Sequence, residues 1–316
     1  MAILITGGTG FLGSHLARYL LNIDGEKDLV LFDSHLNTDR IQDIQESLTL
    51  VQGDVTDSAQ LANVMERYNV DRVVHLAFLL MGGSEANPVE AVKINCNGTA
   101  NVFHAAHAQR VRRLVYASSV AVYGTRMSLD DEEHNEETPA VPNTLYGAAK
   151  LFIEQLADVY HRQYGLDVVG LRPVSVFGLG RGQRYMSPQQ HFMVRPEIAA
   201  KGKPIKMPPN ETMIDWIYVK DAAKAWSCAL NSPSPQHRVF NMAAERRPVG
   251  DYTAHAKKLL PNAAIEVNDE IEVSLHLVSG ERLRHELNFQ PAFTLEEGLE
   301  DYLEEAKTHK ERGALG

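Results

Sequence analysis

The chain has 316 residues, of which 44% are hydrophobic and 23% charged, as in an ordinary soluble globular protein of one or two domains. Its formal net charge of −10 argues against nucleic acid and against an anionic membrane as partners, because both attract a basic surface. The two cysteines, Cys96 and Cys228, are too few for a disulfide framework, which fits a reducing cytoplasm. The start "MAILITGG" has no basic segment, and no apolar run approaches the ~20 residues of a membrane span.

Short apolar segments alternate with helical patterns over the first 173 residues. The expected strands are 2–6, 29–32, 48–52, 72–77, 113–118 and 167–172, and the expected helices are 12–22, 57–68, 89–109 and 145–163. Strands rich in Val, Ile and Leu, separated by helices, predict an α/β fold with a Rossmann-type, doubly wound parallel sheet.

The regular alternation stops after residue 173. Residues 178–215 are rich in Gly, Pro, Met and Gln, which is typical of long loops around a pocket. One more strand is expected at 237–243, where the chain can return to the sheet. Near the C-terminus, Thr294 followed by Glu297 has the spacing of a capping box, which predicts the start of an amphipathic helix.

A glycine-rich turn joins the first expected strand to the first expected helix. Gly7, Gly10 and Gly13 form the pattern G-x-x-G-x-x-G. A turn without Cβ atoms lets the backbone approach a pyrophosphate, whose charge is stabilised by the helix N-terminus. We expect this turn, with Phe11 and Leu12, to contact a dinucleotide cofactor.

Asp33 ends the second expected strand, twenty residues after Gly13. An acid at this place can accept hydrogen bonds from the adenosine ribose hydroxyls and repel a 2′-phosphate. Ser34 and His35 follow it and no arginine is adjacent, so NAD is favoured over NADP, although Arg40 keeps NADP open. We predict an NAD-binding domain over 1–173.

The rest of the chain is expected to complete that domain and to bind substrate. Parts of 214–243 should return to the NAD-binding domain, and 174–316 should form mainly a small C-terminal substrate-binding lobe.

The segment "TLYGAAK" (144–150) places Tyr146 and Lys150 one helical turn apart on one face. An unperturbed tyrosine has a pKa near ~10 and is a poor base at neutral pH, but a neighbouring ammonium lowers that pKa. Taken alone, the same spacing also fits an ordinary amphipathic helix.

Several motifs together resemble one family. The glycine turn, "YASSVAVYG" (116–124), "YGAAK" (146–150) and "LRPVSVFG" (171–178) are similar to the extended short-chain dehydrogenase/reductase family, the NAD-dependent epimerase/dehydratase group. The resemblance covers essentially the whole chain. It implies that Tyr146 is the catalytic acid/base.

The resemblance implies two partners for that tyrosine. Lys150 would hold the nicotinamide ribose and lower the Tyr146 pKa, and Ser119 would hydrogen-bond the reacting oxygen. Further residues implied to lie at the cofactor are Asp54, Val55, Leu76, Ala77, Phe78, Asn95 and Pro173. Asn95 can equally be a buried structural asparagine. The helices near 89–109 and 145–163 imply a homodimer.

Departures from the family pattern narrow the reaction. Val120 and Ala121 replace the acidic pair of the dehydratases and cannot move protons. Ser175 and Ile214 replace an asparagine and an arginine that serve the substrate pyrophosphate in sugar-nucleotide epimerases. Arginines that could substitute for this clamp are Arg181, Arg184 and Arg195.

Our leading hypothesis is an NAD-dependent dehydrogenase or reductase acting on a secondary alcohol of a sugar, polyol or hydroxy acid. The alternatives are a sugar or sugar-nucleotide epimerase that recycles NAD internally, and a non-catalytic dinucleotide sensor. The histidines show no spacing typical of a metal site. Expected substrate-side residues are Leu80, Met81, Ser119, Val120, Ser175 and Arg184.

Overall fold

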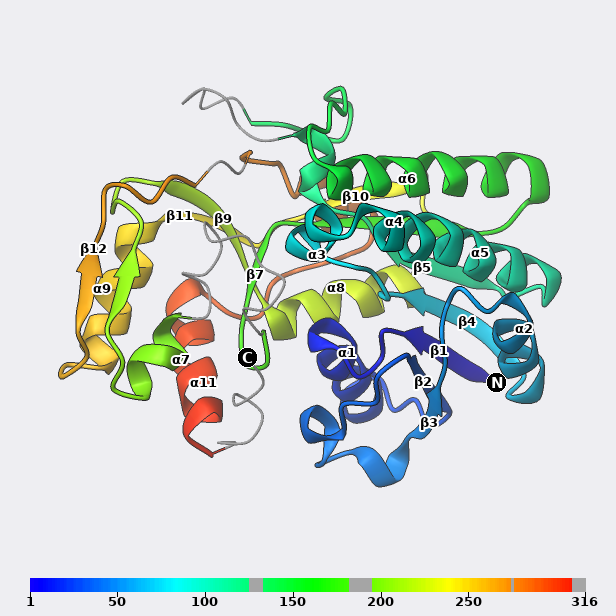
Figure 1. Ribbon diagram of the computed structural model, residues 1–316, viewed down its shortest axis with the longest axis horizontal. Coiled ribbons are helices and arrows are strands. Elements are labelled where there is room, and N and C mark those ends of the chain that lie inside the picture. The colour runs from blue at the N-terminus through cyan, green and yellow to red at the C-terminus, as the bar shows by residue number, and fades with distance from the viewer. Residues whose placement is uncertain (125–132, 182–194, 274–275, 309–316) are drawn as a thin grey trace.

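A seven-stranded parallel sheet forms the centre of the computed structural model (Figure 1), which describes residues 1–124, 133–181, 195–273 and 276–308. Its strands are β1 (Ala2–Thr6), β2 (Leu29–Asp33), β3 (Thr49–Gln52), β4 (Val70–His75), β5 (Arg113–Ala117), β6 (Val168–Pro173) and β10 (Val239–Met242). Their spatial order is β10-β6-β5-β4-β1-β2-β3, so the strand order reverses between β1 and β4. The predicted doubly wound parallel sheet is confirmed, and the strand expected at 237–243 is its edge strand β10, paired with β6.

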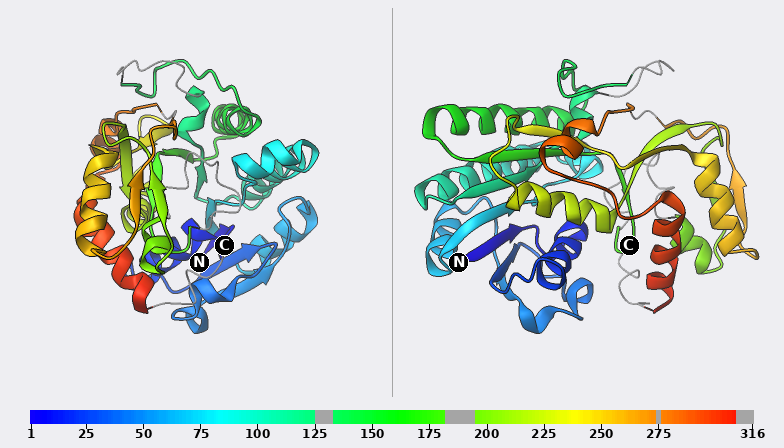
Figure 2. Two further views of the ribbon diagram at one scale, coloured as in Figure 1. Left: turned by 60° about the vertical axis from the view of Figure 1, so that its left-hand side comes forward. Right: turned by 180° about the vertical axis from the view of Figure 1, so that it is seen from behind.

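Helices cover both faces of this sheet (Figures 1 and 2). They are α1 (Phe11–Asn22), α2 (Ser58–Arg67), α5 (Thr99–Ala108), α6 (Leu145–Tyr164) and α8 (Val219–Asn231). Successive strand residues point to opposite faces, and β1 shows the consequence. Ile3 and Ile5 pack in a core with Leu16 of α1. Leu4 packs in a separate core with Phe103 of α5 and is equally buried.

The segment expected to be one helix over 89–109 is divided. It consists of α4 (Pro88–Ala91), a π-helix η3 (Val92–Gly98) and α5, and it is preceded by the short helix α3 (Met81–Ala86). Asn95 lies inside the π-helix and is fully buried. A π-helical turn often marks a functional site, because it changes which side chains face a neighbouring element.

The remaining strands form two small sheets at one end of the central sheet (Figure 1). β7 (Ser175–Phe177), β9 (Met213–Tyr218) and β11 (Glu245–Pro248) form one, and β8 (Ile205–Met207) and β12 (Ile265–Val267) form the other. The helices here are α7 (Arg195–Ala200), α9 (Val249–Leu259) and α11 (Leu295–Thr308), whereas α10 (Glu281–Glu286) packs against β10 of the central sheet.

The expectation of long loops over 178–215 is met only in part, because its described residues include α7, β8 and the beginning of β9. Met207 and Ile214 are buried strand residues and belong to the core that also contains Ile5. The rings of Trp216 and Tyr252 stack with their centroids 4.7 Å apart. The sequence pattern hid this core because β8 has only three residues and is separated from β9 by the polar, proline-containing turn "PPNET".

The last helix begins as predicted. The Thr294 amide donates to Glu297 Oε2 at 2.9 Å, and the Glu297 amide donates to Thr294 Oγ1 at 3.2 Å, which is a reciprocal capping box. Within the described ranges, none of the helices is long and apolar enough to cross a membrane. The described part of the chain also contains the 3-10 helices η1 (Thr38–Ile41), η2 (Gln45–Ser47) and η4 (Val120–Tyr123).

Candidate active site

The carboxyl ends of β1 and β4 meet where the strand order reverses, which is where open α/β sheets bind ligands. Gly7 follows β1 with φ +67°, and its amide donates to the Phe32 carbonyl at 2.8 Å. A Cβ on Gly7 would lie 2.8 Å from the Ala77 nitrogen. The turn after β1 therefore packs directly against the segment that follows β4.

The start of α1 is packed equally tightly against that turn. A Cβ on Gly13 would lie 2.4 Å from the Gly7 carbonyl oxygen, and the Gly10 amide donates to the same carbonyl at 3.0 Å. Gly10 is the N-cap, so no side chain caps α1, and no acidic residue lies in its first turn. The first backbone amides of α1, around Phe11 and Leu12, therefore have no side-chain cap. They form a positive helix end that fits a pyrophosphate.

Asp33 is fixed at the end of β2. Its carboxylate accepts hydrogen bonds from Thr9 Oγ1 at 3.0 Å, from the Thr9 amide at 3.2 Å and from the His35 amide at 3.3 Å. Carboxylate oxygens have further lone pairs, so Asp33 can still accept from a ribose hydroxyl. Arg40 donates to the Gly180 carbonyl at 3.0 Å instead of forming an ion pair with Asp33.

Asp54 and Val55 lie beyond β3, on the same side as Asp33. Asp54 accepts from the Thr56 amide at 2.8 Å, which orders this turn. Val55 is buried against Gly98 of the π-helix, where a Cβ would lie 2.6 Å from the Val55 Cγ2 atom. The two residues therefore form an ordered edge, consistent with the predicted contact to the cofactor.

The chain after β4 connects the glycine turn to the predicted acid/base. The Leu76 amide donates to the Thr6 carbonyl at 3.0 Å. The Phe78 ring meets the Tyr146 ring edge-on, with centroids 5.5 Å apart, and Lys150 Nζ lies 3.3 Å from the Phe78 centroid. Leu76, Ala77 and Phe78 thus lie between the glycine turn and α6, which carries the predicted acid/base.

The Asn95 side chain holds the chain that follows Phe78 by hydrogen bonds. Its Oδ1 accepts from the Leu79 amide at 2.7 Å, and its Nδ2 donates to the Leu79 carbonyl at 3.1 Å and to Ser84 Oγ at 3.3 Å. Both ends of the Asn95 amide are engaged with protein groups. This arrangement favours the structural interpretation over direct cofactor contact.

Ser119, Tyr146 and Lys150 are brought together at the carboxyl end of β5. The Thr144 hydroxyl caps α6 by accepting from the Gly147 amide at 3.0 Å, so Tyr146 and Lys150 share the first turns of that helix. Ser119 hydrogen-bonds the Tyr146 side chain. Lys150 Nζ lies 5.5 Å from the Tyr146 ring centroid and donates to the Ala117 carbonyl at 2.6 Å.

The electrostatics of this group differ from the sequence-based expectation. Burial raises the pKa of Tyr146, while the hydrogen bond from Ser119 and the positive charge of Arg181 lower it. Burial also holds the pKa of Lys150 well below its usual range, opposed by Glu154. Arg181 is therefore a nearby cation that lowers the Tyr146 pKa, and the same role for Lys150 stays a prediction.

Two ionisable side chains that the sequence analysis did not single out support the site. Glu154 and Arg172 form a buried, two-pronged ion pair with nitrogen–oxygen distances of 2.6 and 2.8 Å, and Ser118 donates to the same carboxylate. This pair joins α6 to β6 beside the predicted catalytic group. Arg181, which the sequence analysis named only as a possible substitute for the phosphate clamp, also lies near Tyr146. Arg172 stands in the motif "LRPVSVFG", but nothing in its spacing from Glu154 signalled the pairing.

The predicted substrate-side residues fall into two groups. Val120 and Ser175 line a small cavity with Val174, Ile214, Asp215 and His276. Ser175 is 3% exposed, and its Oγ has no hydrogen-bond partner. Leu80 is exposed just before α3, which Met81 begins.

Pro173 ends β6 beside β10. Arg184 lies outside the described residues, as does the side chain of Arg195.

The fold and site define an α/β protein with a dinucleotide cradle beside a serine–tyrosine–lysine group. Residues 3–243 match the model of the NAD dependent epimerase/dehydratase family. This chain belongs to that family, which confirms the sequence resemblance and NAD as the cofactor, and it is an enzyme of the dehydrogenase/epimerase class that acts on a small molecule.

Curated and solved relatives include both reaction types. The chain is 30% identical to a UDP-glucose 4-epimerase of Halalkalibacterium halodurans over 239 residues, 71% of this chain and 69% of that protein. An L-threonine dehydrogenase from Clostridium difficile matches with a TM-score of 0.86 and 27% identity, covering 100% of this chain and 99% of the other. A Thermus thermophilus UDP-glucose 4-epimerase in complex with NAD shares the fold, with a TM-score of 0.82 and 24% identity over 99% and 100% of the two chains.

Proposed function

We propose that this protein is an NAD-dependent dehydrogenase that interconverts a secondary alcohol and its ketone on a sugar, polyol or hydroxy acid. The observation that carries the proposal is the apolar lining of the cavity beside Ser119. Val120 and Ile214 are apolar and buried, and the described residues that line the adjoining cavity include no lysine or arginine. A nucleotide diphosphate would need such cations to bind. The lining of this cavity therefore favours a smaller and less charged substrate.

Ser119 and Tyr146 would supply the proton chemistry. Ser119 would hold the substrate oxygen by a hydrogen bond, and Tyr146 would accept the hydroxyl proton during oxidation and return it during reduction. NAD, when bound, accepts the hydride from the carbinol carbon. Because phenolate is the required form for oxidation, groups that lower the Tyr146 pKa favour the reaction at neutral pH.

Lys150 is proposed to hold the nicotinamide ribose. Its ammonium donates to the Ala117 carbonyl and lies over the Phe78 ring, which fixes Nζ between the cradle and Tyr146. His75 is buried, and this burial together with the Lys150 charge lowers the His75 pKa to about 3. His75 is therefore neutral at physiological pH and does not compete for the proton that Tyr146 transfers.

Replacing Tyr146 with Phe tests the proposal. The variant keeps the ring packing against Phe78 and loses only the hydroxyl, so turnover should fall by about 10²–10⁴-fold while NAD⁺ affinity stays within twofold. Steady-state rates and calorimetric titration with NAD⁺ measure the two quantities. Unchanged turnover would refute the role of Tyr146, whereas NAD⁺ binding without chemistry on any substrate, in either protein, would support the sensor hypothesis.

A sugar or sugar-nucleotide epimerase is the second candidate. The similarity to the Halalkalibacterium halodurans UDP-glucose 4-epimerase favours it, and Arg181 is a cation close enough to act on Tyr146. In that reaction the hydride would return to the other face of the substrate, so NAD would remain bound. Cofactor retained through purification, together with interconversion of two sugar epimers, would establish this alternative.

We further propose a homodimer in the cytoplasm. Phe152, Val159 and Tyr164 of α6 and Val89 and Val92 near the π-helix are exposed apolar side chains, which a second copy could cover. Both cysteines are free, as in a reducing compartment. Light scattering at micromolar concentration should give twice the monomer mass, and a monomer mass would refute a stable dimer.

The division of the chain also remains a proposal. We propose that 1–173, with parts of 214–243, bind NAD, and that 174–316 mainly bind substrate. Pairing of β10 with β6 supports the return of the chain to the large sheet. Limited proteolysis in the presence of NAD⁺ should protect 1–173 selectively; uniform protection would argue against this division.

A further inference from the structure

Arg181 lies near the N-terminal end of α1, although it is remote in sequence. Its guanidinium carbon is 5.6 Å from the centroid of the Phe11 ring, and Phe11 is the first residue of α1. One guanidinium nitrogen donates to the Val176 carbonyl, while Nε is buried with no hydrogen-bond partner. Among the described residues, no carboxylate forms an ion pair with Arg181.

A largely buried guanidinium without a counter-ion is unfavourable, because the protein replaces only part of its hydration. Burial lowers the pKa of Arg181 to about 10, although the Tyr146 and Tyr302 hydroxyls oppose this. Arginine nevertheless stays charged at neutral pH and has five donors, most of which are still available here. An arginine held in this way is suited to bind an anion with two oxygens, such as a phosphate group.

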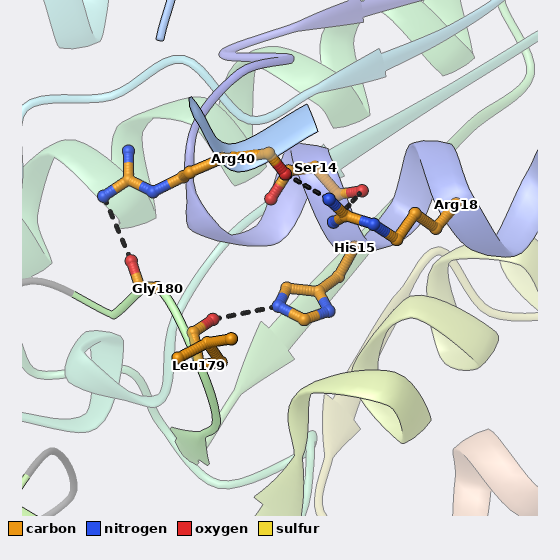
Figure 3. A pocket seen from close by; sticks show the side chains of 6 residues that line it. All are labelled: Ser14, His15, Arg18, Arg40, Leu179 and Gly180. Atoms are coloured by element: carbon orange, nitrogen blue, oxygen red, sulfur yellow. Dashed lines mark hydrogen bonds between the residues drawn. The ribbon is translucent and has the colours of Figure 1, made fainter. Parts of the chain in front are cut away.

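The backbone that leads to Arg181 is held against the first helix (Figure 3). His15 Nε2 of α1 donates to the Leu179 carbonyl at 2.9 Å, and Arg40 donates to the Gly180 carbonyl at 3.0 Å. Arg18 in turn donates to the Arg40 carbonyl and forms an ion pair with Asp43. The Arg181 side chain therefore starts from a fixed position, which reduces the entropy lost when it binds a ligand.

We propose that Arg181 is a diphosphate-binding residue of the cofactor site, where it supplies the positive charge that the glycine turn lacks. The turn offers backbone amides and a helix N-terminus, which are partial charges only. Arg181 adds a full charge between that turn and Tyr146, so the same guanidinium would contact the diphosphate and act on the acid/base. A diphosphate can also belong to a nucleotide-sugar substrate, but the contact with Phe11 of the cradle favours the cofactor.

Affinity for NAD⁺ tests this directly, without any substrate. Calorimetric titration of full-length protein freed of bound cofactor would compare wild type with Arg181→Gln and Arg181→Lys. The glutamine variant should bind NAD⁺ roughly 10- to 100-fold more weakly, because charge-assisted hydrogen bonds are lost, and the lysine variant should be intermediate. Added salt should weaken binding to wild type more steeply than binding to Arg181→Gln.

Arg162→Gln is the matched control, since Arg162 is an exposed residue of α6 paired with Asp158 and its replacement changes the net charge equally. It should bind NAD⁺ like wild type. Thermal unfolding of each variant identifies any loss of folded protein.

A parallel titration with UDP separates the two sources of diphosphate. NAD⁺ affinity within twofold of wild type in Arg181→Gln would overturn the proposal, and loss of UDP binding alone would assign Arg181 to a nucleotide substrate. Because no turnover is measured, either result stands whether the enzyme is a dehydrogenase or an epimerase.

Discussion

The proposed cofactor side and the proposed substrate side of this site are built in opposite ways. On the cofactor side, the backbone packs so closely within a few residues that a side chain cannot be added. Gly13, for example, lies directly against the Gly7 carbonyl. On the substrate side, Val120, Ser175 and Ile214 come from three distant segments and meet around a small cavity. The first region is specified locally by glycine, whereas the second is specified by side chains that can vary on an unchanged fold.

The largest expected effect breaks the cofactor side. In Gly13→Val, the new Cβ would lie 2.4 Å from the Gly7 oxygen and 2.7 Å from the Gly8 oxygen, so α1 must move away from the turn. We expect NAD⁺ affinity to fall by roughly 100-fold or more and the free energy of unfolding to fall by about 1–3 kcal/mol. Calorimetric titration and urea unfolding measure these quantities.

Gly25→Ala is a control for stability loss alone. Gly25 has φ +72°, and a Cβ added there would meet no atom within 4 Å, so alanine adds backbone strain of about 1–2 kcal/mol without a clash. NAD⁺ affinity should be unchanged in this variant. Equal loss of affinity in both variants would contradict a specific role for the Gly13 packing.

A smaller effect is expected at Ser119, where the two sides meet. Because burial raises the pKa of Tyr146, the phenolate fraction increases with pH, and kcat/KM for alcohol oxidation should rise roughly tenfold per pH unit until Tyr146 ionises. Ser119→Ala removes a hydrogen bond that lowers this pKa, so the profile should shift to higher pH. Profiles of kcat/KM for the two proteins check the shift, and superimposable profiles would exclude it.

The smallest effect concerns the helix that carries Tyr146 and Lys150. Thr144→Ala removes the hydroxyl that accepts from the Gly147 amide, which should lower the free energy of unfolding by about 1 kcal/mol. Thr144→Ser keeps the oxygen and should retain most of the stability. Urea unfolding distinguishes the two variants, and equal losses would show that the cap is unimportant.

Local patterns predicted the cofactor side better than the rest. Gly7, Gly13 and Asp33 could be placed because a strand, a turn and a helix follow one another within a short segment. Thr294 and Glu297 were equally predictable, since both partners of the capping box lie within one turn. Such features depend on neighbours in sequence.

Features that depend on distant partners were missed. The π-helix containing Asn95 interrupts a pattern that reads as one continuous helix. The strand β11 reads "ERRP" and has no apolar alternation, because Arg246 is ion-paired with Asp215 of β9 instead of packed in a core. Arg181 could be named as a cation, but its approach to Phe11 and Tyr146 follows only from the fold.

The most direct test of the central claim is near-ultraviolet absorbance of the purified protein with NAD⁺ and pools of secondary alcohols. Reduced nicotinamide should accumulate with a small sugar, polyol or hydroxy acid, and not with sugar nucleotides. No accumulation from any pool, together with bound NAD and interconversion of a sugar nucleotide with its epimer, would contradict the dehydrogenase assignment.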